Sequence, residues 1–234
     1  MNHRKLLVVG ATGDVGQGLV AAALESGRTV VAASRSAEKL QRLADSCPGL
    51  HTVAGSLETE AHALRLWETA AAAVDGLDAV AVSVNAANVP TPLRDLAAED
   101  IARVHAANLL THFNAVRAFV PRLPSTGLYV GVGGGMADFV APGLAHLSMV
   151  QAALRMMYRG FAREYREGPL IRELLIASMV NGQSKRDRAE EAWVTDVECG
   201  RHLCAILDDP AAFDAPIITL RSRGQVGKPD RAPA

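Results

Sequence analysis

The chain has no excess of charge of either sign. Its 24 Lys and Arg residues balance 25 Asp and Glu residues, so the formal net charge is -1 over 234 residues. A balance this even provides no general attraction to nucleic acid or to an anionic membrane surface, and we expect neither as a partner. The length suits a single α/β domain that can bury a sizeable core.

Long apolar runs and paired cysteines are also absent. No run approaches the roughly 20 apolar residues that span a bilayer, and Gly10, Thr12 and Gly13 interrupt the N-terminal run before it could form a signal peptide. The three cysteines are an odd number, and their spacings suit neither a metal site nor a redox pair. We therefore expect reduced thiols, no bound metal and a cytoplasmic location.

What the chain does contain is an alternation of short apolar runs and longer amphipathic stretches. The short runs are mostly continuous and rich in β-branched residues, which is typical of strands covered on both faces. This alternation predicts an α/β fold of right-handed βαβ units, with helices on both sides of a parallel sheet. We expect strands at 5–10, 28–34, 49–55, 77–84, 127–133, 170–178 and 215–221, and helices at about 14–26, 36–46, 58–74, 98–121, 143–167 and 193–207.

A glycine-rich turn joins the first expected strand to the first expected helix. In VVGATGDVGQGLV, Gly10, Gly13 and Gly16 recur every three residues. Glycines permit a tight turn and the close approach of a phosphate, and the N-terminus of the next helix offers unpaired N–H groups to that anion. The position of the turn favours a dinucleotide site. Asp14 is discordant, because its carboxylate would repel a pyrophosphate unless it points outward.

The end of the second expected strand indicates which dinucleotide would bind. Sites that take NAD usually have an acid here for the ribose hydroxyls, about 20 residues after the glycine turn. This chain has Ser34 and Arg35 instead, and a guanidinium with a hydroxyl suits a 2′-phosphate. We therefore expect NADP(H) as the cofactor, although Arg35 could also be a solvated surface arginine.

These motifs resemble those of the short-chain dehydrogenase/reductase family, over about residues 4–221. TGDVGQG (12–18) is similar to the family's glycine motif, although one residue shorter than its commonest form. VNAAN (84–88) resembles the family's Asn-Asn-Ala-Gly turn after the fourth strand, and Asn108 falls where the family has its helix asparagine. The resemblance implies a single Rossmann-type domain over residues 1–221, with a doubly wound parallel sheet of about seven strands, before a tail at 222–234.

The resemblance also implies how chains associate and which residues contact the cofactor. Family members usually form dimers or tetramers through two long helices, here 98–121 and 143–167, so we expect a homodimer or homotetramer that binds a small-molecule substrate or ligand. Ser56 stands where the family often has an aspartate that touches the adenine. The residues expected to contact the cofactor are Gly10, Thr12, Gly13, Asp14, Val15, Gly16, Ser34, Arg35, Ser56, Leu57, Asn85, Ala86 and Ala87.

GLAHLSMVQAAL (143–154) departs from the family where its chemistry is expected. Family members use a tyrosine phenol as the proton donor, and a lysine one helical turn away lowers its pKa. Aligning QAAL with the family's Lys-Ala-Ala-Leu puts Leu147 at the tyrosine and Gln151 at the lysine. A shift by one residue puts His146 and Val150 there instead, so neither register restores the pair.

Other residues could take over the missing roles. His146 is a candidate proton donor, because imidazole titrates near neutral pH without help from a lysine. Ser148 could orient a carbonyl oxygen, and Asn108 remains from the family's catalytic set. The family's serine falls within the three glycines 133–135, which we expect to leave space beside the nicotinamide for a bulky ligand or a water. The charged run 183–193 is typical of a solvated helix or a mobile lid.

Three functions remain open on these observations. The first is an NADP(H)-dependent oxidoreductase that acts on a carbonyl or alcohol with an altered proton-transfer arrangement. The second is a catalytically inactive NADP-binding sensor or partner subunit, and the third is a non-redox enzyme, such as a cyclase or isomerase, that reuses the pocket. We favour the first, because hydride transfer needs only an aligned cofactor and substrate, while proton delivery can be rearranged.

Overall fold

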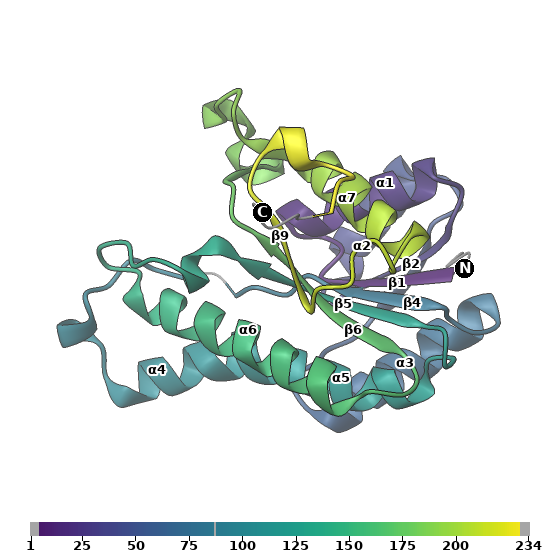
Figure 1. Ribbon diagram of the computed structural model, residues 1–234, viewed down its shortest axis with the longest axis horizontal. Helices are drawn as coiled ribbons and strands as arrows, with labels where there is room; N and C mark the ends of the chain where they lie inside the picture. Colours follow the sequence, from purple (N-terminus) through teal and green to yellow (C-terminus); the bar gives the residue numbers. More distant parts are fainter. Residues whose placement is uncertain (1–4, 87, 230–234) are drawn as a thin grey trace.

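Seven parallel strands form the centre of the molecule (Figure 1). The computed structural model describes residues 5–86 and 88–229. The strand order is β3-β2-β1-β4-β5-β6-β9, so the direction of winding reverses between β1 and β4. In sheets of this kind, ligands bind outside the carboxyl ends of the strands at that reversal. The strands are β1 (Lys5–Val9), β2 (Thr29–Ser34), β3 (His51–Ala54), β4 (Ala79–Val82), β5 (Leu128–Gly134), β6 (Leu170–Ile176) and β9 (Ile217–Leu220).

Helices cover both faces of this sheet. Figure 1 shows α1 and α7 above the sheet and α4, α5 and α6 below it. The buried apolar side chains accordingly form two clusters, one from the sheet with α1, α2 and α7, the other from the sheet with α3, α5 and α6. The helices are α1 (Asp14–Glu25), α2 (Ala37–Ser46), α3 (Glu60–Val74), α4 (Ala98–His105), α5 (Thr111–Phe119), α6 (Ala145–Glu164) and α7 (Asp196–Asp208).

Side chains cap the starts of α2 and α3. Ser36 Oγ accepts a hydrogen bond from Lys39 N (3.2 Å) at the start of α2, and Thr59 Oγ1 accepts one from His62 N (3.1 Å) at the start of α3. Such caps satisfy backbone N–H groups that have no partner within the helix. The strands need no alternation of polar residues, because both faces are covered: all four residues of β4 are buried.

The predicted doubly wound parallel sheet is confirmed, and each predicted strand and helix is found within a few residues of its expected bounds. The largest local difference lies in the helix expected at 98–121. There α4 continues through a π-helical turn, η2 (Ala106–Leu110), into α5 and then a 3-10 turn, η3 (Val120–Arg122). Asn108 lies inside the π turn, and its Nδ2 donates to Val104 O (2.8 Å). Widened turns of this kind are frequent at functional sites.

Short elements that the sequence pattern did not predict lie mainly in the connections at the sheet's carboxyl edge. The carboxyl end of β6 leads into a small parallel pair, β7 (Val180–Asn181) and β8 (Val194–Thr195), outside the main sheet. The remaining 3-10 turns are η1 (Leu93–Asp95), η4 (Gly135–Ala137), η5 (Gln183–Arg188) and η6 (Arg223–Gln225).

The C-terminal segment returns to the body of the domain as far as it is described. Gly227 N donates to His202 Nδ1 of α7 (3.1 Å). Cys47, Cys199 and Cys204 are all free thiols. Within residues 5–86 and 88–229, no helix combines the length and apolar character needed to cross a bilayer.

Candidate functional site

The glycine turn after β1 packs directly against the neighbouring strands. Gly10 has φ 81°, and its N–H donates to Ala33 O of β2 (2.9 Å). A Cβ atom on Gly10 would overlap the carbonyl oxygen of Ser83 after β4, and one on Gly16 would overlap the carbonyl oxygen of Gly10. The close packing of the turn therefore tolerates no side chain at either position.

The N-terminus of α1 presents an anion-binding arrangement. The first helical hydrogen bond runs from Gln17 N to Gly13 O (3.0 Å). The N–H groups of Asp14, Val15 and Gly16 precede it, and none of the described residues accepts a hydrogen bond from them. Three unpaired N–H groups at the positive end of a helix suit a phosphate.

Asp14 points away from that arrangement, toward the segment after β7. Its carboxylate accepts hydrogen bonds from Ser184 N (2.9 Å) and from Ser184 Oγ. Gln17 Nε2 donates to Gln183 Oε1 in the same contact (3.0 Å). A Cβ atom on Gly182 would lie 2.5 Å from Asp14 Cβ, so the segment approaches closely. The carboxylate that was discordant in the sequence thus anchors this segment to α1.

The end of β2 presents one buried hydroxyl and one exposed guanidinium. Ser34 is 8% exposed, and its Oγ accepts a hydrogen bond from Ser36 N (3.2 Å). Arg35 is exposed, and no carboxylate of the described residues forms an ion pair with it. The guanidinium is therefore available to an anionic ligand group.

The remaining predicted cofactor residues lie after β3 and β4. Ser56 Oγ accepts a hydrogen bond from Glu58 N (3.1 Å), and Leu57 is buried. Asn85 is exposed, and Ala86 N donates to Asn108 Oδ1 (2.8 Å). Ala87 and Thr12 complete the set, but Ala87 lies outside the described residues.

At the start of α6, three candidate side chains have different surroundings. His146 is 3% exposed, and its buried Nδ1 has no hydrogen-bond partner among the described residues. Ser148 Oγ donates to Phe139 O (2.8 Å), which ties the connection after β5 to the helix. Gln151 Oε1 accepts from Gly134 N (2.7 Å), at the end of β5. Leu147 lies between them, half-buried.

The space that we expected at 133–135 is taken by side chains and backbone of the chain itself, and that expectation is wrong. A Cβ atom on Gly133 would overlap Glu173 Oε1, and one on Gly135 would lie 2.7 Å from Ala177 Cα. A Cβ atom on Gly134 would lie 3.6 Å from Gln151 Oε1, an ordinary contact distance. The glycines here serve internal packing rather than a ligand.

Glu173 is the residue that sequence reasoning missed. It is fully buried in β6, and neither carboxylate oxygen has a hydrogen-bond partner among the described residues. Burial raises the pKa of this carboxyl to about 8, against the opposing influence of Arg155. The signal available in the sequence was a lone acid within the apolar strand LIRELLI (170–176).

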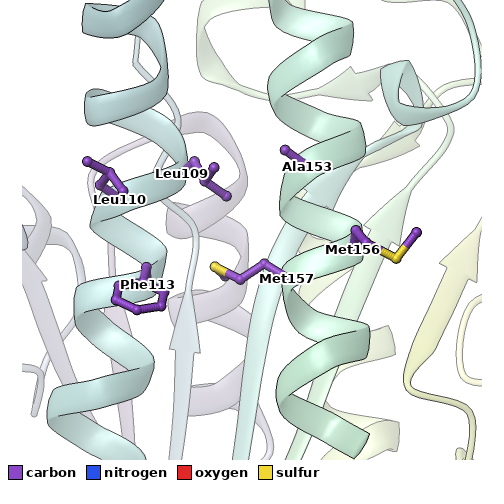
Figure 2. A pocket seen from close by; sticks show the side chains of 6 residues that line it. All are labelled: Leu109, Leu110, Phe113, Ala153, Met156 and Met157. Atoms are coloured by element: carbon purple, nitrogen blue, oxygen red, sulfur yellow. The ribbon is translucent and has the colours of Figure 1, made fainter.

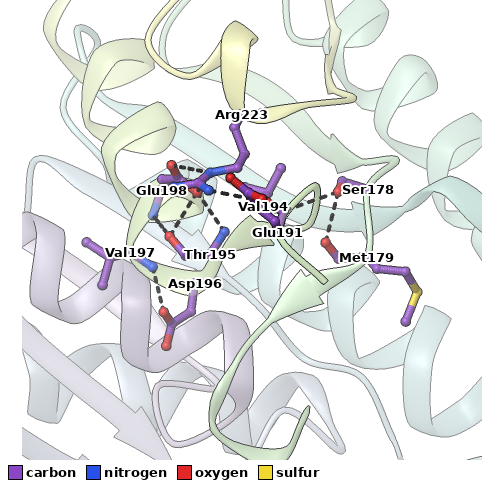
Figure 3. A network of polar contacts seen from close by, with 9 residues as sticks. All are labelled: Ser178, Met179, Glu191, Val194, Thr195, Asp196, Val197, Glu198 and Arg223. Atoms are coloured by element: carbon purple, nitrogen blue, oxygen red, sulfur yellow. Dashed lines mark hydrogen bonds and ion pairs between the residues drawn. The ribbon is translucent and has the colours of Figure 1, made fainter. Parts of the chain in front are cut away.

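A polar network holds the connection between β6 and α7 (Figure 3). Glu198 Oε2 accepts from Thr195 N (2.8 Å), and Arg223 Nε donates to Glu198 Oε1 (2.9 Å). Arg223 also donates to Glu191 O (3.2 Å), and Val194 N donates to Ser178 Oγ (3.3 Å). The charged run 183–193 is therefore held at its end by this network and near its start by Asp14.

Comparison with known proteins places these features in context. The sequence model of the short chain dehydrogenase family matches residues 4–188. A short-chain dehydrogenase/reductase of Pestalotiopsis fici, iacG, is 34% identical over 158 residues, which cover 64% of this chain and 62% of that protein. Carbonyl reductase [NADPH] 2 of Sus scrofa is 29% identical over 165 residues, with 68% and 65% covered. The matched region thus spans less than two thirds of the length of these curated relatives.

Solved structures show the same fold. An NADPH-bound short-chain oxidoreductase of Pseudomonas aeruginosa, which contains an atypical catalytic center, superimposes with a TM-score of 0.79 at 19% identity, covering 94% of this chain and 96% of that one. A double mutant of a Serratia marcescens short-chain dehydrogenase/reductase gives 0.80 at 18% identity, covering 92% and 94%. At these identities the likeness concerns the fold alone.

Proposed function

This chain belongs to the short-chain dehydrogenase family, and from that membership we propose that it is an NADP(H)-dependent oxidoreductase that interconverts a carbonyl compound and an alcohol. One observation carries the proposal: the N–H groups of Asp14, Val15 and Gly16, which have no acceptor among the described residues, lie at the carboxyl edge of the sheet, where Arg35 directly follows β2. A pyrophosphate and a 2′-phosphate are the anions that such a pair of sites would hold.

The preference for NADP(H) rests on charge at the end of β2. No acid stands there to bind the ribose hydroxyls, and the guanidinium of Arg35, which pairs with no carboxylate of residues 5–86 and 88–229, suits a phosphate. Asp14 adds little repulsion, because its carboxylate points to Ser184 and accepts two hydrogen bonds there. The NADPH named for the Sus scrofa and Pseudomonas aeruginosa proteins supports the same choice.

We infer that the proton transfer differs from that of the family, because neither register of 143–154 aligns a tyrosine and a lysine with the family's pair. When bound, NADPH would supply a hydride to the carbonyl carbon of the substrate. We assign the matching proton, which goes to the carbonyl oxygen, to His146, whose buried Nδ1 has no other partner among the described residues. Ser148 already donates its proton to Phe139 O, so we assign it to holding the connection after β5.

The substrate would present an apolar surface. Exposed large apolar side chains gather on the three connections that follow β4, β5 and β6, at the carboxyl edge of the sheet. These connections contact one another, since Thr91 N donates to Gly143 O (2.8 Å) and Gly135 packs on Ala177. The apolar side chains are Val89, 77% exposed, Leu93, 48%, Phe139, 56%, Val140, 67%, and Met179, 50%.

Self-association would use the outer face of α5 and α6. Figure 2 shows α6 beside the continuous helix formed by η2 and α5, with Leu109 and Leu110 on η2, Phe113 on α5, and Ala153, Met156 and Met157 on α6. These residues line an open hollow of about 420 Å³. Leu110 and Met156, which both line this hollow, are 49% and 62% exposed, and apolar side chains gathered on a surface mark an interaction site. A homodimer or homotetramer would cover them.

A catalytically inactive NADP-binding protein is the second candidate. Gln151 favours it, because its carbonyl oxygen holds Gly134 N and no charged group replaces the lysine. The two candidates differ in turnover and share nucleotide binding.

The test combines titration of the full chain with NADPH and a screen of apolar ketones and aldehydes for NADPH oxidation. We expect saturable binding and carbonyl-dependent oxidation that His146→Ala abolishes without loss of binding. Binding with no turnover on any carbonyl would support the inactive candidate, and product formation without a change in nicotinamide absorbance would indicate a non-redox enzyme. The absence of nucleotide binding would refute both candidates.

A further inference from the structure

Two side chains of one helical stretch hold the residues on either side of Asn85. Asn108 Oδ1 accepts a hydrogen bond from Ala86 N (2.8 Å). His112 Nε2 lies 2.9 Å from Val84 O. Residues 84–86 include two that the family resemblance predicts to contact the cofactor, so the position of this segment bears on nucleotide binding.

The hydrogen bonds of His112 determine its tautomer. His112 is fully buried, and burial lowers its pKa to about 4, so the ring is neutral at physiological pH. A carbonyl oxygen can only accept, so the proton is on Nε2 and is donated to Val84 O. Nδ1 must then accept, and its partner is the hydroxyl of Tyr158 of α6, at 2.6 Å. The phenol therefore donates its single proton to His112.

The Tyr158 hydroxyl and the Glu173 carboxyl fill the spaces beside two glycines on one face of β5. A Cβ atom on Gly131 would overlap the Tyr158 hydroxyl, and one on Gly133, two residues along, would overlap Glu173 Oε1. Glu173 also pairs with Gly131 in the register between β5 and β6. The Tyr158 hydroxyl and Glu173 Oε1 thus lie in one buried row, beside glycines two residues apart on β5, with no hydrogen bond between them.

The other ionisable groups around Glu173 come from three elements. Arg155 of α6 forms an ion pair with Asp138, which follows η4, so the two charges oppose each other at Glu173. Tyr129 of β5 is fully buried beside Tyr158, with ring centroids 6.1 Å apart. Burial raises the pKa of both phenols above the physiological range, so they stay neutral. Glu173 is therefore the group in this row whose charge can change near neutral pH.

We propose that Glu173, Tyr158 and His112 form a buried row of positioning residues that holds residues 84–86 for the cofactor, and that the protonation state of Glu173 controls this hold. The inference rests on the proposed binding of NADP(H). A neutral Glu173 leaves the Tyr158 proton with His112. An ionised Glu173 is the stronger acceptor, because hydrogen bonds to a charged group are about twice as strong, and it withdraws that proton from His112. His112 then loses one of its two anchors and holds Val84 O less firmly, while Asn108 still holds Ala86.

The direction of the pH dependence follows from the burial of Glu173. Because burial raises its pKa to about 8, the carboxyl is neutral at pH 7 and ionised at pH 9. Affinity for NADPH should therefore be constant below about pH 7 and fall through pH 8. The loss of one buried hydrogen bond corresponds to roughly a threefold to tenfold weaker affinity.

The test measures the dissociation constant of NADPH by fluorescence titration between pH 6 and 9.5. The full chain is compared with Glu173→Gln, which keeps the shape and removes the ionisation, and with Glu167→Gln, an exposed acid outside the row. We expect the natural chain and Glu167→Gln to weaken together above pH 8, and Glu173→Gln to keep its pH 7 affinity. Tyr158→Phe should bind more weakly at pH 7 and show no further loss at pH 9. A pH profile in Glu173→Gln that matches the natural chain would overturn the proposal.

A nucleotide-free measurement separates this inference from the proposed function. The backbone amide resonances of Asn85 and Ala86, followed by nitrogen-15 NMR, should shift with a midpoint near pH 8 in the natural chain and remain unshifted in Tyr158→Phe and Glu173→Gln. If NADPH fails to bind but these resonances titrate, the cofactor assignment is wrong. The proposed control of residues 84–86 by Glu173, Tyr158 and His112 then still stands. If they do not titrate in the natural chain, the row does not control residues 84–86.

Discussion

The carboxyl group of Glu173 in β6 occupies the space that Gly133 in β5 leaves beside it. A side chain at Gly133 would overlap Glu173 Oε1, so the glycine and the buried acid require each other. The acid has no hydrogen-bond partner among the described residues, and such a group normally reduces stability. Its presence in the core explains why Gly133 leaves no room for a ligand.

The free energy of unfolding should decrease as pH rises. The pKa of Glu173 is about 8 in the folded chain, against an ordinary value of 4.5, so the folded state holds the proton more tightly. The contribution of Glu173 to the free energy of unfolding is complete below about pH 4.5. It is lost, at about 1.4 kcal/mol per pH unit, as pH rises toward 8. Urea unfolding at pH 6, 7 and 8 should show this slope in the natural chain and in Glu167→Gln. If Glu173→Gln keeps the same slope, another group is responsible.

Substitution of Gly133 by alanine should destabilise the fold by about 1–3 kcal/mol, because the new methyl group overlaps the Glu173 carboxylate in a closed space. Gly134→Ala is the matched control on the next residue, where the nearest atom would lie at an ordinary contact distance of 3.6 Å. Thermal and urea unfolding would measure both. The double variant Gly133→Ala with Glu173→Ala should recover part of the loss, and equal destabilisation by both single alanines would argue against the specific contact.

Reversal of the charge at Arg35 should weaken NADPH more than NADH. The 2′-phosphate is present only in NADPH, and a charge-assisted hydrogen bond contributes about 1.5–3 kcal/mol, which corresponds to roughly a 10- to 100-fold change in the dissociation constant. Arg35→Glu would be compared by fluorescence titration with Arg65→Glu, a change at an exposed arginine of α3. Equal weakening of both nucleotides by Arg35→Glu would remove Arg35 from the 2′-phosphate site.

A charge on the outer face of α6 should prevent self-association. Met156→Glu places a carboxylate in an apolar face that includes Phe113, and a buried unpaired charge is strongly unfavourable. Light scattering coupled to gel filtration should show a dimer or tetramer for the natural chain and a monomer for Met156→Glu. Leu170→Glu, at a residue 38% exposed outside the two helices, should keep the natural size. A natural chain that runs as a monomer at high concentration would refute the interface.

Most of the fold was predictable because its signals are local. Runs such as the four buried residues of β4 are apolar throughout, and helices such as α2 carry their own caps, so hydrophobic pattern and capping residues identify both. The π-helical turn around Asn108 was not predictable in this way. It depends on a side chain that bonds both its own helix and Ala86, and the pattern of apolar residues does not change there.

The sequence by itself determined the doubly wound sheet and the glycine turn at the N-terminus of α1. These features follow from residue types and from their spacing along the chain, which are the same however the chain is packed. Only the tertiary structure decided where the polar groups point. Asp14 is hydrogen-bonded to Ser184, 170 residues away, and Tyr158 is hydrogen-bonded to His112, 46 residues away. A buried polar group is defined by its partners, and those partners come together only when distant segments pack against one sheet.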